Sequence, residues 1–394
     1  MTTTTSAADN RRSAIRFIVC LGIVSLFADM TYEGAYSGLG SLLQGFGASA
    51  LAVGFISGLG EMIAAGLRYF SGKLADRTHA YWTIVVIGYV LNMLAIPGLG
   101  FAQSWPVVAL LVVAERTGKA IRGPARDVLL SEATEVVGHG WGFGLHAAMD
   151  QTGAVIGPLL LGLAIARLGG VRPAFVLLVV PAVLALASLL LARHFRHTPG
   201  HAPRTKPPQP LPRVFWTYVI AAGVLAGGFF DFPLLNYHLT QSGLFHADTV
   251  SYLYALAMGA TGLAALVCGR LFDRHGLPVL IFGVLVTMLA LPLGFLGGRL
   301  AAATAVVCWG AGLGVQDATL RSGIAQVVSM NKRGTAFGTF NGVYGVMWFL
   351  GSVVMGYLYS YSLVALVVFG LVLQVAAALL FAWIRRPLAA ARAD

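Results

Sequence analysis

Residues 115–127 read E-R-T-G-K-A-I-R-G-P-A-R-D and lie inside an otherwise apolar segment that begins near Pro106. An ionisable side chain at the centre of a membrane span costs about 2.5 to 3.5 kcal/mol on insertion scales. Helical spacing puts these side chains on two stripes about 100° apart, so both must face other helices or a water-filled cavity. One stripe holds Glu115, Lys119, Arg122 and Arg126, and the other holds Arg116 and Asp127.

The composition predicts that the whole chain forms a bundle of membrane-spanning helices. Of its 394 residues, 58% are hydrophobic and 10% are charged, and the mean hydropathy is +0.80. A soluble chain carries roughly 25% charged residues, whereas apolar runs with the length of a membrane helix recur here from Ile15 to Ile384. We expect an all-α polytopic membrane protein with spans at 14–43, 48–70, 80–102, 106–130, 139–166, 172–193, 214–241, 249–270, 276–297, 300–328, 335–359 and 362–384.

A polar, basic and proline-rich interval interrupts the apolar runs midway. Residues 194–213 cannot continue a helix and are expected to form a cytoplasmic linker. The predicted organisation is an N-terminal tail (1–13), a six-helix bundle (14–193), the linker (194–213), a second six-helix bundle (214–384) and a C-terminal tail (385–394).

The net charge of +11 follows membrane topology, which argues against a nucleic-acid partner. With the N-terminus inside, most basic residues outside the spans fall on the inner side, and only Arg167, Arg172 and Arg299 fall outside. This asymmetry predicts that both termini are cytoplasmic. We therefore expect a multi-pass protein of the cell membrane, in contact with the lipid bilayer and monomeric.

The two halves of the chain repeat weakly. G-K-L-A-D-R at residues 72–77 returns as G-R-L-F-D-R at residues 269–274. The spacing of Gly157 and Gly162 after a Phe-Gly pair also returns, in Gly351 and Gly356. Two parallel, pseudo-symmetric halves imply a substrate path between them near the midplane of the membrane.

On these motifs the chain resembles the major facilitator superfamily over its whole span architecture. The loop after the second span resembles the family's G-x-L-a-D-R-x-G loop but has His79 in place of glycine, and Arg116 resembles the family's helix-four arginine. Residues 153–162, G-A-V-I-G-P-L-L-L-G, resemble the element of drug:proton antiporters. The run G-K-x-I-R-x-P-x-R-D, with D-x-x-x-E on the first span, also resembles a poorly characterised prokaryotic efflux-type subgroup. The resemblance implies two six-helix bundles that work by alternating access.

Each motif also has a physical interpretation. Gly153, Gly157 and Gly162 allow close contact between helices, and Pro158 removes a backbone donor and bends the fifth span. The repeated loop predicts a cytoplasmic gate at Gly72, Asp76, Arg77, Gly269, Asp273 and Arg274. There the carboxylates in short turns would cap neighbouring helices, and the arginines would pair with acids such as Asp127, Glu132 or Glu135. The alternative is an ordinary turn with solvated charges.

Carboxylates within the spans are the candidates for proton or cation coupling. Asp29 and Glu33 share one face of the first span, and Asp150 lies alone on the fifth. Burial and mutual repulsion suit such groups to reversible proton binding. The alternative is a fixed bridge to Arg116 or Lys119. Glu61 on the second span is expected to join Glu115, Lys119, Arg122, Arg126 and Asp127 in a buried charge network.

Polar and aromatic residues within the spans are candidates for a substrate cavity, although membrane aromatics often face lipid or core. The candidates are Arg116, Tyr36, Asp231, Tyr237, His238, Asp317, Arg321, Tyr344 and Trp348. A local pair is the alternative for Asp317 and Arg321, which lie one turn apart.

The sequence favours a secondary active transporter, most plainly a proton-coupled exporter of a small molecule. No nucleotide-binding segment or nucleophile with a base is visible, so we expect no enzyme activity, no cofactor and the proton gradient as energy source. The histidines lack metal-ligand spacing, but export of a divalent metal ion through Asp29, Glu33, Asp231 and His238 remains an alternative. Further alternatives are uptake of an anion drawn by Arg116, Lys119 and Arg122, and a transporter-like membrane sensor.

Overall fold

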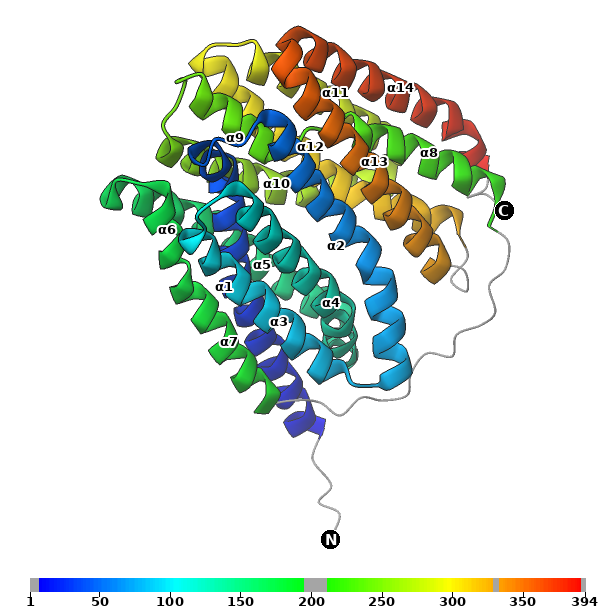
Figure 1. Ribbon diagram of the computed structural model, residues 1–394. Coiled ribbons are helices and arrows are strands. Elements are labelled where there is room, and N and C mark those ends of the chain that lie inside the picture. The colour runs from blue at the N-terminus through cyan, green and yellow to red at the C-terminus, as the bar shows by residue number, and fades with distance from the viewer. Residues whose placement is uncertain (1–6, 195–210, 329–332, 391–394) are drawn as a thin grey trace. The chain divides into compact units, whose positions relative to one another are not determined.

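The computed structural model describes residues 7–194, 211–328 and 333–390, which are helical with no strand among them (Figure 1). In this part of the chain, eleven segments are long and apolar enough to cross a membrane. The charged helix α4 (Trp105–Val137) is not among the eleven, but its 33 residues make it about 50 Å long, enough to cross. The prediction of an all-α polytopic bundle with about twelve spans is therefore confirmed.

The helices follow the predicted spans, and several of them extend beyond the predicted bounds. The described part of the chain contains α1 (Ala7–Gly45), α2 (Ala50–Thr78), α3 (Tyr81–Gly98), the 3-10 helix η1 (Leu99–Phe101), α4, α5 (His139–Leu168), α6 (Val171–Leu177), α7 (Val179–His194), α8 (Arg213–Gly227), α9 (Phe232–Gln241), α10 (Ala247–His275), α11 (Leu277–Phe295), α12 (Arg299–Val327), α13 (Arg333–Tyr361) and α14 (Leu363–Ala390). Parts of both predicted tails are therefore helical.

Two spans that were predicted to be continuous are broken. The sixth is divided at Leu178 into α6 and α7, and the seventh is interrupted at residues 228–231, between α8 and α9. Proline in the first turn of α9 favours a new helix start at this point. The break is hidden in the sequence because residues 228–230 are apolar or glycine and keep the hydropathy high.

Side chains from other helices satisfy the backbone at the break in the seventh span. Nε2 of Gln374 donates to the carbonyl of Gly228 at 2.8 Å, and Nε1 of Trp309 donates to the carbonyl of Phe230 at 2.9 Å. Unpaired carbonyl groups at this depth would each cost several kcal/mol. The break is therefore supported by α12 and α14, which fix where Asp231 begins α9.

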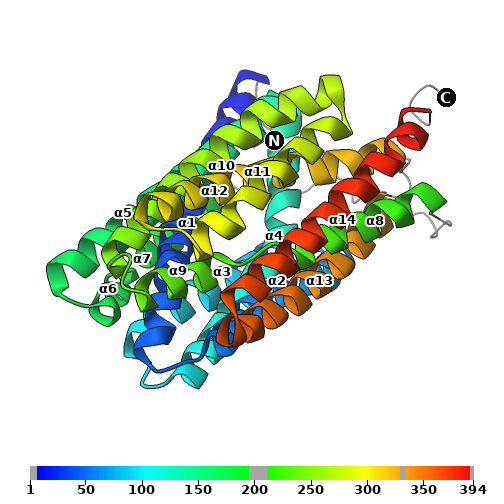
Figure 2. The same cartoon turned by 90° about the horizontal axis from the view of Figure 1, so that it is seen from above.

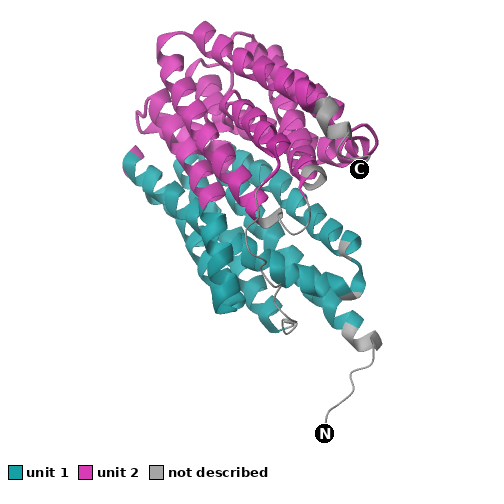
Figure 3. Ribbon diagram, turned by 90° about the vertical axis from the view of Figure 1, so that its right-hand side faces the viewer, with its two compact units in different colours: residues 1–35, 67–102, 106–204 teal, residues 36–66, 103–105, 205–394 magenta. Residues whose placement is uncertain are grey.

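The structure forms two compact units, coloured in Figure 3. Unit 1 comprises α1 up to Ala35, α2 from Leu67, α3, and the chain from Pro106 through α7. Unit 2 comprises the remaining parts of α1 and α2 together with α8 to α14. Most of the predicted linker, residues 195–210, lies outside the described residues. The division into bundles at 14–193 and 214–384 stays a prediction.

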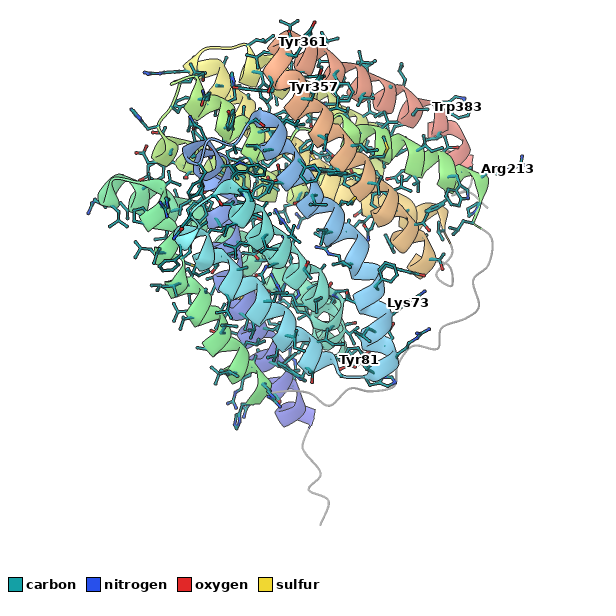
Figure 4. The ribbon with its side chains drawn as sticks, in the orientation of Figure 1. Lys73, Tyr81, Arg213, Tyr357, Tyr361 and Trp383 are labelled. Atoms are coloured by element: carbon teal, nitrogen blue, oxygen red, sulfur yellow. The ribbon has the colours of Figure 1, made fainter. Side chains whose placement is uncertain are left out.

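In unit 2, α8 packs against both α13 and α14, and α12 packs against both α10 and α11 (Figure 2). Large aromatic side chains remain exposed near the ends of α13 and α14: Tyr357, Tyr361 and Trp383 are 60%, 80% and 71% exposed (Figure 4). Tyrosine and tryptophan gather at the two membrane interfaces of helical bundles. Their positions suit a membrane-embedded unit.

The repeated gate motif is helical in both halves, which corrects the expectation of short turns. Asp76 and Asp273 lie in the last turns of α2 and α10, so their backbone groups belong to those helices. The residue that follows each helix has a positive φ, +52° at His79 and +69° at Gly276. The family's glycine position thus has a positive φ in both copies, which costs the non-glycine residue His79 about 1 to 2 kcal/mol.

We expect His79→Gly to stabilise the protein by about 0.5 to 1 kcal/mol, because glycine adopts the positive φ without backbone strain. The greater conformational entropy of glycine in the unfolded chain offsets part of this gain. Gly276→Ala should destabilise it by about 1 to 3 kcal/mol, since φ +69° with ψ −142° is almost restricted to glycine. Thermal melting of both variants in one detergent is the measurement. Shifts of the same sign would contradict the helix-end account.

Candidate functional site

Glycines bring α5 against α1 inside unit 1. A Cβ atom at Gly153 would overlap the carbonyl oxygen of Leu26, and one at Gly157 would overlap that of Met30. Small residues permit this close backbone approach, as predicted from the glycine spacing. The contact sets Asp150, less than one helical turn before Gly153, beside the first helix.

The close contact joins two carboxyl groups. Asp29 of α1, only 4% exposed, lies beside Asp150 of α5, close enough for the two carboxyl groups to interact directly. A carboxylate can only accept, so a hydrogen bond between two carboxyl groups requires a proton on one of them. Glu33 and Lys119 lie within electrostatic range of Asp29. The structure therefore brings the three coupling candidates together, with a cation beside them.

Substituting Gly153 tests whether helix contact holds this pair. Gly153→Val should destabilise the protein by about 1 to 3 kcal/mol, because the side chain must push α5 away from α1. Gly144→Ala on the same helix is the matched control, since a Cβ there meets nothing within 4 Å. Thermal melting in detergent compares the two. Equal melting of both variants would argue against the tight contact.

The cations of α4 are held by partners within unit 1. Nε of Arg116 lies 3.3 Å from Oε2 of Glu115, and Nδ2 of Asn92 donates to the same carboxylate at 2.9 Å. Nζ of Lys119 lies 3.7 Å from the centre of the Tyr32 ring. These cation contacts with a carboxylate and an aromatic face compensate part of the cost of burial.

Arg122 departs from the expectation of an acidic partner. Its guanidinium carbon lies 4.2 Å from the centre of the Tyr89 ring, and the side chain is buried. Among the described residues, no carboxylate lies within ion-pair distance of it. An aromatic face suits a planar, weakly hydrated guanidinium, and sequence spacing alone could not show that Tyr89 of α3 would face it.

A polar chain continues from the carboxyl pair along α1, α4 and α5. Nε2 of His146 lies 2.9 Å from Oγ of Ser25, and Nη1 of Arg126 donates to Ser25 at 3.4 Å. Arg126 pairs with Asp127, its neighbour in sequence, at 2.9 Å. Sequence spacing alone assigned no role to His146, since the histidines do not have the spacing of metal ligands. The spacing of the residues could have shown that His146 lies near Ser25. Each is four residues before an aspartate, Asp150 and Asp29, and therefore shares a helix face with it.

Asp231 is the central polar residue of unit 2. It directly precedes α9 at the break, is 1% exposed, and accepts hydrogen bonds from Nε1 of Trp348 and Oγ of Ser352, both at 2.7 Å. Oη of Tyr36 donates to it at 3.3 Å. Three donors compensate a buried carboxylate well. The structure thus joins three predicted cavity residues, Tyr36, Asp231 and Trp348, and adds Ser352.

Aromatic rings surround the start of α9. The ring of Phe229 lies 5.1 Å from Trp348 and 5.8 Å from Trp309, and Phe232 lies 4.3 Å from Tyr254. Tyr254 in turn lies 6.0 Å from Tyr36. Such offset rings are individually worth about 0.5 to 1.5 kcal/mol beyond area burial. The buried carboxylate therefore stands in an aromatic shell, which fits a site for organic groups.

The remaining predicted cavity residues of unit 2 form two further groups. On α9, Nδ1 of His238 lies 3.0 Å from Oη of Tyr359, and the Tyr237 ring lies 5.7 Å from the Tyr359 ring. On α13, Oη of Tyr344 donates to Gln316 at 3.2 Å. Electrostatic interactions link Tyr344 with Glu61, Asp317 and Arg321. Asp317 and Arg321 are exposed, so this group offers both signs of charge to solvent or substrate.

The C-terminal end of α1 and the N-terminal end of α2 are joined to α9 and α13 within unit 2. Ser41 donates to Asn236 at 2.6 Å, Asn236 donates to the carbonyl of Ser37, and Gln44 donates to Gln241 at 2.7 Å. A Cβ at Gly54 would overlap the carbonyl oxygen of Ser352. This side of unit 2 is therefore closed by polar contacts and close glycine packing.

The proposed gate residues lie at the opposite ends of their helices. Asp76, Arg77, Asp273 and Arg274 are exposed, and the carboxylate of Asp76 lies within electrostatic range of the Tyr81 side chain. Beyond the predicted fourth span, partial burial raises the pKa of Glu132, with the carboxylate of Glu135 as a smaller cause. Arg77 forms no ion pair with any described residue, so the expected arginine–acid contact is not made in this structure.

A metal site is not visible in this part of the chain. Among the described residues, no group of three or more His, Cys, Asp or Glu side chains could hold a metal ion. His238 contacts Tyr359, and Asp231 accepts from three donors. The alternative of a cation site at Asp29, Glu33, Asp231 and His238 therefore gains no support.

Known sequences match this chain over nearly its full length. A family model described as the Major Facilitator Superfamily matches residues 20–352 and, in a second match, 232–393. An uncharacterized protein of Mycobacterium tuberculosis, Rv2265, is 38% identical over 385 residues, which cover 95% of this chain and 94% of that protein. Multidrug resistance protein MdtH of Photorhabdus laumondii is 31% identical over 118 residues, or 30% of this chain and 29% of that protein.

Solved structures share the fold. A mutant of the nucleoside transporter NupG superposes with a TM-score of 0.78 at 13% identity, covering 93% of this chain and 100% of that one. A bacterial homologue of the human lysosomal transporter Spinster, in an inward-facing and unoccupied conformation, gives a TM-score of 0.72 at 14% identity. That match covers 96% of this chain and 98% of the other.

Proposed function

Because the chain belongs to the Major Facilitator Superfamily and is a membrane transporter rather than an enzyme, we propose that it exports a small organic molecule in exchange for protons. The observation that carries this proposal is the close contact of α1 and α5 at Gly153, which sets the buried carboxyl groups of Asp29 and Asp150 side by side in unit 1. Two carboxyl groups that share one proton can release and regain it, which a secondary transporter without a nucleotide site requires.

The ammonium group of Lys119 can stabilise the carboxyl pair in place of the shared proton. This group lies over the Tyr32 ring and within electrostatic range of Asp29. When the proton leaves, the cation stabilises the resulting pair of carboxylates. Alternation between a proton-bound and a cation-compensated pair supplies the two states that coupling needs.

The substrate site proposed here is the surroundings of Asp231 in unit 2. Tyr36, Trp348 and Ser352 hold its carboxylate, and the rings of Phe229, Trp309 and Tyr254 lie close by. A largely apolar and aromatic lining with a few placed polar groups is the usual composition of small-molecule sites. The partial likeness to MdtH, a multidrug resistance protein by name, supports export as the direction.

The alternative of anion uptake is less well supported. Glu115 compensates Arg116, Asp127 compensates Arg126, and the rings of Tyr32 and Tyr89 cover Lys119 and Arg122. Cations already engaged in this way attract an external anion weakly. We further propose, from the basic residues alone, that the protein lies in the cell membrane with both termini cytoplasmic.

Reconstituted vesicles provide the test. An inside-acid gradient is imposed, a trapped pH dye is followed, and organic cations, zwitterions, neutral nucleosides and organic anions are added one at a time. The proposal expects at least one organic compound to release protons at a rate that depends on the protein and on the gradient. Binding of the same compounds, measured by thermal stabilisation, with no proton release or exchange would instead support the sensor alternative.

A further inference from the structure

The proposed exchange of protons assigns no role to a buried histidine of α5. His146 is 5% exposed and lies one helical turn from Asp150 on the same face of α5. Its Nε2 contacts Oγ of Ser25, a fully buried serine one turn from Asp29 on α1. Each carboxyl group of the pair thus has a group able to exchange a proton one turn away on its own helix: His146 for Asp150 and Ser25 for Asp29.

We infer that His146 and Ser25 form a proton relay between the Asp29–Asp150 pair and the exposed carboxylate of Asp127. The inference rests on the proposed function, in which the carboxyl pair carries the transported proton. It adds the route by which that proton reaches the side of the membrane where α4 ends and α5 begins.

Exposure rises along the route. Asp29 is 4% exposed, whereas the side chain of Arg126 is 20% exposed and that of Asp127 is 56% exposed. Arg126 contacts both Ser25, at 3.4 Å, and Asp127, at 2.9 Å. The chain of contacts therefore leads from the interior of unit 1 to its surface at Asp127.

The charges that face His146 come from two helices. Asp150 of its own helix and Asp127, Arg122 and Arg126 of α4 all act on the imidazole. The two carboxylates favour a bound proton and the two guanidinium groups oppose it. Acidic and basic groups therefore face the ring together, and imidazole is the side chain best suited to pass a proton between such groups.

The transfer needs no other reactant than water. The protonated carboxyl of the pair gives its proton to one nitrogen of His146, which leaves two carboxylates. The imidazolium then releases a proton from Nε2 to Oγ of Ser25, which passes its own hydroxyl proton onward. Oδ1 of Asp150 and Oη of Tyr89 are buried without a hydrogen-bond partner among the described residues. Such atoms ordinarily bind water, which would bridge the steps to Asp127.

The test is a pH jump on the purified full-length chain with infrared detection of protonated carboxyl groups. Parent, His146→Ala and Ser25→Ala are compared, and Thr152→Ala serves as control because its hydroxyl bonds only the carbonyl of Ala148 on the same helix. The band of interest is the carboxyl band that is missing from Asp29→Asn. After the pH jump, we expect this band to decay on the order of 100-fold more slowly in His146→Ala than in the parent. Its final intensity should be the same in both. Imidazole in the medium should restore part of the rate. Thr152→Ala should match the parent.

Two outcomes are distinguished. A parent chain without any band that depends on Asp29 would overturn the proposed function itself. A band that decays as fast in His146→Ala as in the parent, or that imidazole does not accelerate, would overturn the relay alone. If His146→Ala melts below the working temperature, His146→Gln replaces it. The amide of glutamine keeps a hydrogen bond to Ser25 but does not exchange the proton. Decay of the band at the parent rate in His146→Gln would again exclude the relay.

Discussion

Replacing Asp29 by asparagine should abolish proton-driven transport while leaving the protein folded. The amide of asparagine can still donate to Asp150, so the helix contact between α1 and α5 is kept, but no proton can be released from the pair. We expect the proton flux that accompanies a transported compound to fall by on the order of 100-fold or more. Asp150→Asn should have the same effect, because the proton belongs to the pair.

Vesicles with an imposed pH gradient provide the measurement for both variants. Asp248→Asn on α10 is the control, since this carboxylate lies in the first turn of its helix and contacts Thr249. Exchange of labelled for unlabelled compound without a gradient should persist in Asp29→Asn. Coupled flux at the parent level in either pair variant would remove the shared proton from the mechanism.

Replacing Asp231 by alanine should destabilise unit 2 and eliminate binding of the organic substrate. The change leaves the indole N–H of Trp348 and the hydroxyl of Ser352 buried without their acceptor, and each such group costs about 1 to 3 kcal/mol. It also removes the carboxylate from the aromatic shell. We expect a loss of about 2 to 5 kcal/mol in stability and no detectable transport.

Asp231→Asn separates the two effects. The amide oxygen can still accept from one donor, so most of the stability should return, while the charge stays absent. Thermal melting and equilibrium binding of the compounds found by proton release are the measurements. Normal binding by Asp231→Asn would show that the carboxylate only supports the break between α8 and α9.

The carboxyl pair illustrates what the sequence allowed and what it did not. Asp29 and Asp150 were recognised as costly residues within spans, but their contact depends on how α1 and α5 are turned towards each other. The glycines that produce the contact were also recognised. Asp150 lies three residues before Gly153, on nearly the same helix face. Combining those two observations would have predicted the pair.

Other features depended on three-dimensional neighbours. The break before Asp231 is satisfied by Gln374 and Trp309, which are distant in sequence and show no pattern that marks the role. The Tyr89 partner of Arg122 is likewise visible only when α3 and α4 are placed together. In contrast, the helical character of the chain, its spans and the charged α4 followed from hydropathy and helix period, which depend on local sequence.

An infrared pH titration of the purified protein shows directly whether Asp29 and Asp150 share a proton. A shared proton gives one protonated-carboxyl band that disappears as the pH rises, and that is missing from both Asp29→Asn and Asp150→Asn but present in Asp248→Asn. A band that persists in both pair variants, or a parent chain in which no carboxyl group of the pair titrates, would contradict a proton shared between α1 and α5.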